Sequence, residues 1–373
     1  MNLRVAVVGT GFGRAFAHIF RDHPDCQVVC ICDLHKDRAA EVAKEVGAER
    51  VAGELKEVLA MSDIEAVAIF THAPRHAEHS IAALRAGKHV LCAVPAAITL
   101  EECAQLVETV RETGLVYANA ETSFWRPATA QCRQWYREGR FGRIVYMEAE
   151  YLHDHSTLVG ITASPPEYGG KNWREAGFPP FLYPTHSTGH LLGVTGGRLV
   201  EVTAYPSPIP DDEVFRADTY WKCPFGNAVA LFRTDDGVPV RIMEMRRIAY
   251  ECVEKFSIYG QNFSFVSPLA AGWESNYRLF SREANGRVVG PNYWPRRALY
   301  APLPEPLVKY TYGGHGGSHP YIVEDFVRAL REGVPPQVNV YEAVAYCAPG
   351  IVAHQSCLRD GERLKIPQFG RIE

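Results

Sequence analysis

The segment Tyr183 to His190, Tyr-Pro-Thr-His-Ser-Thr-Gly-His, holds the residues best suited to move protons. Histidine has an unperturbed pKa of roughly 6.5, so it can accept and release a proton near neutral pH. If a helix begins near Thr185, His186 and His190 are four residues apart and lie on one of its faces. We expect His190 or His186 to act as the acid/base group, with Tyr183 as a weaker candidate. The alternative is a structural histidine pair.

A second pair of histidines lies in the glycine-rich segment Gly313-Gly314-His315-Gly316-Gly317-Ser318-His319. Glycines let the backbone approach a ligand closely, and Ser318 is expected to cap the helix that follows. We therefore expect His315 and His319 to contact a substrate. The alternative is a mobile glycine loop whose histidines are solvated.

Two shorter segments add polar side chains that suit contacts to sugar hydroxyls. His153-Asp154-His155 ends a predicted strand, and Lys171-Asn172-Trp173-Arg174 adds donors and an aromatic face, or else forms a plain surface loop. The residues expected to bind substrate here are His153, His155, Trp173 and Arg174. Imidazole and carboxylate also suit Zn, Mn or Fe. Nothing in the spacing places these groups with His186 and His190 in one coordination sphere, so no metal is expected.

The N-terminal segment predicts a nucleotide-binding unit that would position these groups. The apolar strand Leu3–Val8 leads into Gly9-Thr10-Gly11-Phe12-Gly13, an amphipathic stretch follows, and a second strand ends at Asp33. This order of strand, glycine turn, helix, strand and acid is typical of a dinucleotide fingerprint. Gly9 would permit the tight turn, and Gly11 would let backbone N–H groups approach the pyrophosphate. Asp33 would bind the ribose hydroxyls of adenosine.

The fingerprint departs from the usual pattern at its third glycine. That position holds Arg14, while Gly13 comes one residue early. The carboxylate of Asp33 would repel a 2′-phosphate, which favours NAD over NADP. Three cations near this acid make the preference moderate, namely Arg14, Lys36 and Arg38.

Alternating strands and helices continue to residue 118 and predict a doubly wound parallel sheet of the Rossmann type. Helices are expected over 37–46, 55–61, 74–86 and 99–113, and strands over 66–69, 89–92 and 116–118. Thr99 and Glu102 form a capping box. Ligands of such sheets bind outside the carboxyl ends of the strands, where Glu121 also lies, and His76 is expected to pack locally. The residues expected to bind the cofactor are Gly9, Thr10, Gly11, Phe12, Asp33, Thr71, His72, Ala93 and Pro95.

From Phe141 onward the pattern changes to long strands. Strands over 144–151, 227–232, 238–243 and 255–260 predict an α+β region with an open, mainly antiparallel sheet. The region from Ala270 to Pro306 is rich in Pro, Gly and aromatic residues and is expected to be a long loop, followed by helices over 321–331 and 342–358. We expect two domains, an NAD-binding Rossmann domain over 1–122 and a substrate-binding domain over 123–373.

Composition indicates a soluble globular protein. The chain has 47% hydrophobic and 22% charged residues and a formal net charge of −4, which gives no reason to expect binding to nucleic acid or a membrane. No apolar run approaches the roughly 20 residues of a membrane-spanning helix, and the N-terminus has no signal-peptide pattern. The ten cysteines are scattered, so buried reduced thiols and a cytoplasmic location are expected.

The stretch from Ala86 to Pro95, a helix end, a buried strand and a loop, resembles the Gfo/Idh/MocA family of sugar and polyol dehydrogenases. Members carry Glu-Lys-Pro where this chain has Ala93-Val94-Pro95. The resemblance continues to Leu364-Lys365-Ile366-Pro367 and implies NAD, a carbohydrate-like small molecule as substrate, and a homodimer or homotetramer formed through the second sheet. It also implies that His190 matches the family's catalytic histidine.

Val94 stands where the family uses lysine for proton transfer. Oxidation of a carbinol needs a base, and loss of such a base costs about 10²–10⁴ in rate, so histidine is expected to replace the lysine. The Tyr-Pro-Thr-His and Gly-His-Gly-Gly segments resemble the family's NAD-dependent glycosidases, which catalyse no net oxidation. Three functions stay open: an NAD-dependent oxidoreductase acting on a sugar, polyol or glycoside, a redox-neutral glycosidase or lyase, and a catalytically silent nucleotide-binding protein.

Overall fold

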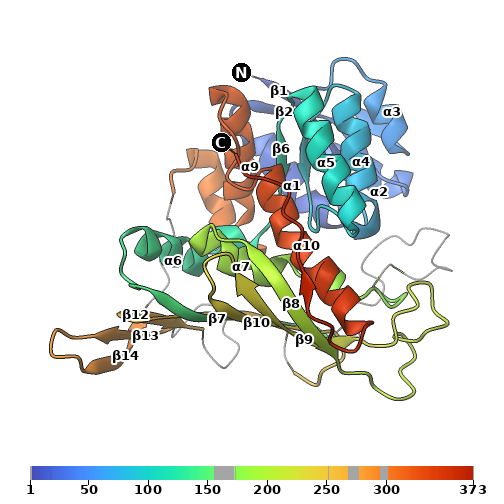
Figure 1. Cartoon of the computed structure of the whole chain (residues 1–373). Coiled ribbons are helices and arrows are strands. Elements are labelled where there is room, and N and C mark those ends of the chain that lie inside the picture. Colours follow the sequence, from blue (N-terminus) through green and yellow to red (C-terminus); the bar gives the residue numbers. More distant parts are fainter. Residues whose placement is uncertain are drawn as a thin grey trace.

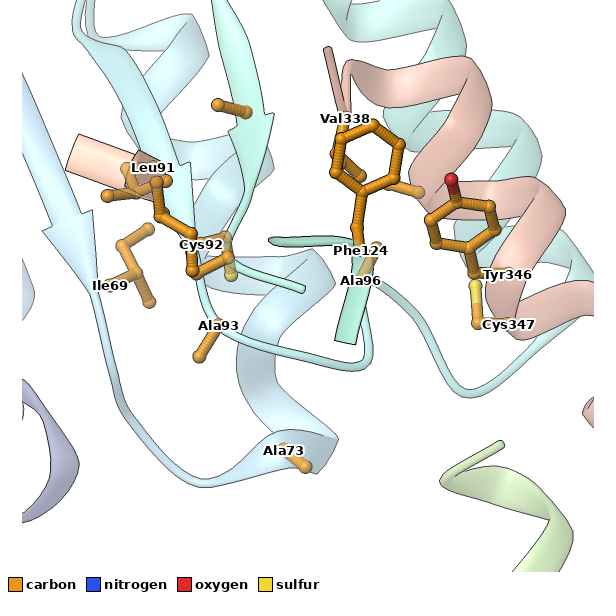
Figure 2. Packing of buried hydrophobic residues seen from close by; sticks show 14 of the residues in the cluster. Ile69, Ala73, Leu91, Cys92, Ala93, Ala96, Phe124, Val338, Tyr346 and Cys347 are labelled. Atoms are coloured by element: carbon orange, nitrogen blue, oxygen red, sulfur yellow. The ribbon is translucent and has the colours of Figure 1, made fainter. Parts of the chain in front are cut away.

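The chain folds into two β-sheets that lie in separate layers, with helices between and around them (Figure 1). The computed structural model describes residues 2–154, 172, 174–250, 252–267, 277–294 and 301–372. The long helix α10 (Val340–Cys357) runs between the layers and contacts strands of both sheets. Figure 2 shows the core continuing from Leu91 and Cys92 of the first sheet to Tyr346 and Cys347 of this helix.

The first sheet, in the described part of the chain, has six parallel strands in the order β3-β2-β1-β4-β5-β6. These are β1 (Leu3–Val8), β2 (Cys26–Cys32), β3 (Arg50–Ala52), β4 (Ala66–Ile69), β5 (His89–Cys92) and β6 (Tyr117–Asn119). Nearly every residue of β1, β4 and β5 is buried, as expected for strands covered on both faces. The strand order reverses between β1 and β4, which places a ligand crevice at their carboxyl ends. The predicted parallel sheet is confirmed.

Helices alternate with these strands as predicted. They are α1 (Thr10–Asp22), α2 (Lys36–Val46), α3 (Leu55–Leu59), α4 (His76–Arg85) and α5 (Leu100–Thr113). The predicted capping box is present, because Thr99 Oγ1 accepts from the N–H of Glu102 at 3.1 Å and Glu102 Oε2 accepts from the N–H of Thr99 at 3.2 Å. The later helix α9 (His319–Glu332) packs on α1 through Phe20 and Phe326, so the C-terminal part of the chain completes this layer.

The second sheet has nine strands among the described residues, in the order β14-β13-β12-β11-β7-β10-β9-β8-β15. These are β7 (Ile144–Leu152), β8 (Leu199–Pro206), β9 (Asn227–Thr234), β10 (Pro239–Met245), β11 (Val253–Gly260), β12 (Phe263–Val266), β13 (Tyr277–Arg282), β14 (Val288–Trp294) and β15 (Leu364–Lys365). Neighbours are antiparallel except β7 and β10, so the mainly antiparallel sheet is confirmed. Helix α7 (Thr185–Thr195) packs on β7 and β11, and α6 (Pro127–Arg137) packs on α7. The domain boundary at 122 stays a prediction.

Two local predictions were wrong. The described residues between Ala270 and Pro306 include the hairpin of β13 and β14, at the lower left of Figure 1. The proline-rich composition misled because β14 is the outermost strand, and an edge strand tolerates Pro291, which lacks an N–H. Ser318 precedes α9 but gives it no side-chain cap. Its backbone angles are already helical, whereas a capping side chain needs extended angles.

Within the described ranges, no helix is both long and apolar enough to cross a bilayer. All ten cysteines are free thiols, and nine of them are buried. Burial raises the pKa of the Cys30 thiol to about 11, so this group stays protonated at neutral pH.

Gly13→Ala is expected to lower the free energy of unfolding by about 1–3 kcal/mol, the usual cost of overpacking a core. A Cβ at this position would lie 2.9 Å from Cδ2 of Phe70, whose ring is packed against Phe16. Chemical denaturation measures the change. Gly11→Ala is the matched control, because an added Cβ there has no atom within 4 Å. Equal losses in both variants would contradict the packing role of Gly13.

Candidate active site

The glycine turn after β1 allows a ligand to approach the backbone closely. Gly9 has a φ of +88°, and a Cβ there would lie 2.5 Å from the carbonyl oxygen of Phe70. Gly11 is exposed and has open space around it, so the first turn of α1 is accessible. Gly13 packs against Phe70, which is the packing role of the third glycine in a dinucleotide fingerprint. The turn therefore fits a pyrophosphate at the N-terminus of α1.

Asp33 follows β2 and is buried beside the same turn. Its Oδ2 accepts from the N–H and the hydroxyl of Thr10 at 2.8 and 2.6 Å, and its Oδ1 accepts from the N–H of His35 at 2.9 Å. Nη2 of Arg38 donates to both oxygens, at 2.8 and 2.9 Å. Burial alone would raise the pKa of Asp33, but these hydrogen bonds outweigh it and hold the pKa below its usual value. Asp33 is therefore an ionised carboxylate at the adenosine end of the crevice.

The loops after β4 and β5 are tied together by His76, which packs locally as predicted. Its Nδ1 lies 2.9 Å from the carbonyl oxygen of Pro95, and its Nε2 lies 2.9 Å from that of Thr71. Figure 2 shows Ala93 on the loop beyond the end of its strand. Val94 is buried and carries no proton-transfer group at this strand end.

The glycine-rich segment brings the C-terminal part of the chain to the nucleotide turn. His315, Gly316 and Gly317 all have φ between +52° and +75°, a backbone region that only glycine adopts freely. A Cβ at Gly317 would lie 1.9 Å from the carbonyl oxygen of Thr311, so the turn requires glycine there. The result is a sharp bend that places the ring of His315 at 5.3 Å from that of Phe12.

His315 and His319 form a neutral pair beside this contact. His319 Nε2 lies 3.2 Å from His315 Nδ1, and the ring of His319 lies 5.2 Å from that of Phe12. Burial lowers the pKa of His315 to about 4 and that of His319 to about 3. The ring of His315 also lies 6.3 Å from that of His186, so it connects the nucleotide turn to α7.

His186 is paired with a carboxylate from the first sheet. Its Nδ1 lies 3.0 Å from Oε1 of Glu121, which follows β6 and is fully buried. A Cβ at Gly189 would lie 2.7 Å from Cγ of Glu121, so glycine on α7 makes room for this pair. Burial lowers the pKa of His186, but the carboxylates of Glu121 and Glu254 outweigh burial and raise it above 6.5. His186 can therefore hold a proton near neutral pH.

Aromatic and basic side chains surround the other side of His186. The rings of Tyr183 and Tyr151 lie 5.3 and 5.2 Å from its imidazole. The hydroxyl of Tyr151 lies 2.6 Å from Nδ1 of His153, and burial lowers the pKa of His153 to about 4. The guanidinium of Arg174 lies 5.6 Å from the ring of Tyr183. Three predicted residues, Tyr183, His153 and Arg174, thus lie in one region with His186, and Tyr151 joins them without having been predicted.

His190 lies one helical turn further along α7 in a more enclosed environment. Its Nδ1 lies 2.6 Å from the hydroxyl of Thr129, and its ring stacks on Phe256 at 4.5 Å. Its Nε2 lies 3.7 Å from Oε2 of Glu254. Burial, aided by the charge of Arg126, holds the pKa of His190 below its usual value although Glu254 raises it. His186 therefore holds a proton up to a higher pH than His190 does.

Two predicted residues cannot be placed, and one contributor to the site was missed. His155 and Trp173 lie outside the described residues. No three His, Cys, Asp or Glu side chains of the described ranges are grouped so as to hold a metal ion. Glu254 was not predicted, although its Oε2 accepts from Ser123 Oγ at 2.9 Å and its Oε1 lies 2.7 Å from Arg126 Nη2. Glu121 was singled out by its place at a strand end, whereas nothing in the sequence pattern singled out Glu254.

Glu121→Gln is expected to lower the pKa of His186, because the neutral amide no longer stabilises the imidazolium. NMR titration of labelled histidine measures it. In the native chain the raised pKa stabilises the fold below about pH 6.5 and this contribution is lost as pH rises through the folded pKa. Glu342→Gln is the control, since Glu342 pairs with Arg198 instead. An unchanged His186 titration in Glu121→Gln would contradict the pairing.

Comparison with known proteins finds family models that match two parts of the chain. Residues 3–121 match the model of the Gfo/Idh/MocA oxidoreductase family, NAD-binding Rossmann fold. Residues 305–373 match the model of the glycosyl hydrolase 109 C-terminal domain. A glycosyl hydrolase family 109 protein of Saccharopolyspora erythraea is 25% identical, with 99% of this chain and 84% of that protein aligned. One of Stenotrophomonas maltophilia is 25% identical, with 99% and 89% aligned.

Solved structures share the fold over nearly the full length. Levoglucosan dehydrogenase in complex with NADH superposes with a TM-score of 0.79 at 22% identity, covering 99% of this chain and 100% of that one. An NAD-binding oxidoreductase of Klebsiella pneumoniae superposes with a TM-score of 0.79 at 17% identity, covering 99% and 100%. Residues 3–121 thus match the NAD-binding Rossmann domain of the Gfo/Idh/MocA oxidoreductases, and residues 305–373 are similar to the C-terminal domain of glycosyl hydrolase 109.

Proposed function

We propose that the chain is a redox-neutral, NAD-dependent glycosidase that cleaves a glycoside by transient oxidation of a ring hydroxyl, elimination, addition of water and re-reduction. The carrying observation is the set of proton-transfer groups around His186: the Glu121 carboxylate, the Tyr183 phenol and the His315 imidazole. Simple oxidation of a carbinol needs one base. Elimination needs in addition a base for a C–H proton and an acid for the leaving oxygen.

The similarity to glycosyl hydrolase 109 supports this choice. The C-terminal domain model spans 305–373 and therefore includes His315, whose ring contacts Phe12 of the nucleotide turn. A region that matches the glycosidase model thus includes a residue in contact with the nucleotide turn. Val94 also supports the glycosidase proposal, because the strand end where the family's dehydrogenases carry lysine is apolar here.

The crevice residues fit the cofactor. Gly9 and Gly11 would admit the pyrophosphate to the N-terminus of α1, and the loops tied by His76 would border the nicotinamide half. Bound NAD would supply a hydride acceptor during oxidation and a hydride donor during re-reduction.

His186 would accept the proton of the substrate hydroxyl and later return it. Because Glu121 occupies Nδ1, the lone pair of Nε2 is the one left for a substrate. Nε2 would take the hydroxyl proton during oxidation and return it at the end of the cycle. Glu121 stabilises the imidazolium formed in between, as a buried carboxylate does for any catalytic histidine that it orients.

In the elimination step, His315 would act as the general base and Tyr183 as the general acid. Burial keeps His315 neutral, so it can accept the acidified C–H proton next to the carbonyl. Burial also raises the pKa of Tyr183, which keeps its hydroxyl protonated and able to donate to the leaving oxygen. Water then adds to the double bond, so one water is consumed and one aglycone released per cycle.

A net sugar dehydrogenase is the second candidate, with His186 or His190 replacing the family lysine as acid/base. It is supported by the fold shared with levoglucosan dehydrogenase over 99% of this chain. In that case oxidation stops at the ketone and the reduced cofactor leaves. His315 and Tyr183 would then only bind substrate hydroxyls.

Aglycone release without accumulation of NADH is the expected result when the purified protein is mixed with NAD⁺ and a panel of aryl glycosides. The hydride returns to the sugar in every cycle, so absorbance at the NADH wavelength stays flat while phenol is released. NADH formed in proportion to product would support the dehydrogenase instead. A chain that produces neither signal would be catalytically silent and would contradict both candidates.

His186→Gln is expected to reduce turnover by about 10²–10⁴, the usual contribution of a positioned acid/base group. NAD affinity, measured by calorimetry, should stay nearly unchanged because the glycine turn is intact. His190→Gln is the matched variant on the same helix and should retain turnover within about tenfold, since its ring contacts Thr129 and Phe256. The reverse ranking of the two variants would return the acid/base role to His190.

A further inference from the structure

At the adenosine end of the crevice, the carboxylate of Asp33 is already saturated with hydrogen bonds from the protein. Asp33 already accepts from four donor groups, the N–H and hydroxyl of Thr10, the N–H of His35 and Nη2 of Arg38. A carboxylate offers about four lone-pair positions. Asp33 is also only 5% exposed. A ribose hydroxyl would have to displace an existing donor to bind this acid.

Arg38 is the more accessible partner of the two. Its side chain is 31% exposed, whereas that of Asp33 is 3% exposed. Nε donates to the hydroxyl of Thr10 at 3.0 Å and Nη2 donates to Asp33, so the guanidinium plane is fixed from one side. Nη1 makes no hydrogen bond to any residue that the structure describes. A fixed guanidinium with a remaining N–H group suits a phosphate oxygen.

The other cations of this region are engaged differently. Arg14 is 2.9 Å from Glu41 Oε1 and also pairs with Glu45, both on α2. Lys36 lies along Gly53, where an added Cβ would be 2.8 Å from its Cε. Of these three cations, Arg38 is therefore the one that pairs with Asp33 and lies beside the glycine turn.

We propose that Arg38, and not Asp33, meets the 2′ position of the adenosine ribose, so that the crevice accepts a 2′-phosphate and binds NADP as well as NAD. Asp33 holds the guanidinium in place and balances part of its charge. The inference rests on the dinucleotide site of the proposed function and concerns only its cofactor range. It reverses the preference that an acid after the second strand normally indicates.

Calorimetric titration of the full chain with NAD and NADP tests the proposal. Dissociation constants within about tenfold of each other are expected for the native chain. In Arg38→Ala, NADP affinity should fall by at least about tenfold while NAD affinity changes little, because only the phosphate loses a charged partner. Adenosine 2′,5′-bisphosphate and adenosine 5′-monophosphate repeat the comparison without the nicotinamide half. Arg14→Ala is the matched control and should leave the ratio unchanged.

Distinct outcomes separate this inference from the proposed function. NAD binding without NADP binding in the native chain would overturn the role of Arg38 and leave the catalytic proposal standing. Equal losses of both dinucleotides in Arg38→Ala would also overturn it. Binding of neither dinucleotide would overturn both. Arg38→Gln keeps a donor for Asp33, so the same selective loss in this variant excludes misfolding as the cause.

Discussion

The site depends on the neutralisation of two carboxylates, Glu121 and Glu254, whose side chains are 0% and 7% exposed. Burial alone would raise the pKa of both groups, but their cationic partners hold both pKa values below the usual range. Burial of an ionised carboxylate costs several kcal/mol unless a partner is present. Arg126 supplies one positive charge at 2.7 Å from Glu254. His186, at 3.0 Å from Glu121, supplies the second whenever it takes up a proton. The carboxylates around His186 therefore raise its pKa and allow the buried imidazole to take up a proton. A proton-transfer group must be able to exist in both its protonated and its neutral form.

This charge balance also joins the two layers of the fold. Glu121 follows the last strand of the first sheet, His186 belongs to α7, and Glu254 belongs to β11 of the second sheet. These contacts require α7 to lie close to Glu121. Gly189 permits this because a Cβ at its position would collide with the Glu121 side chain. A change in how the layers pack would therefore alter the protonation of His186 before it altered any substrate contact.

The sequence allowed the first sheet to be predicted because its signals are local. An apolar strand, a glycine turn, a helix and an acid follow one another, and a capping box marks a later helix. The strand β8 and the helix α6 carry no comparable signal and were not predicted. The hairpin of β13 and β14 was hidden by its prolines, which an edge strand tolerates.

The candidate site was predicted only as a set of separate segments. Residues from 183 to 190 were identified because two histidines at helical spacing are visible in sequence. Which of them faces the cofactor depends on partners far away in the chain, Glu121 for His186 and Thr129 for His190. Likewise, Asp33 was recognised from its position after the second strand. Its ion pair with Arg38 was not predicted, because it depends on how the Arg38 side chain of α2 is oriented.

The edge of the first sheet is closed by the far end of the chain. The N–H of Asn119 in β6 donates to the carbonyl oxygen of Val338 at 2.9 Å, and α9 covers α1 through Phe326. A fragment ending after β6 would expose an unpaired strand edge and an apolar helix face, both of which promote aggregation. The nucleotide-binding unit is thus continuous in space although it is discontinuous in sequence, because residues from a much later part of the chain cover its sheet edge and its helix α1.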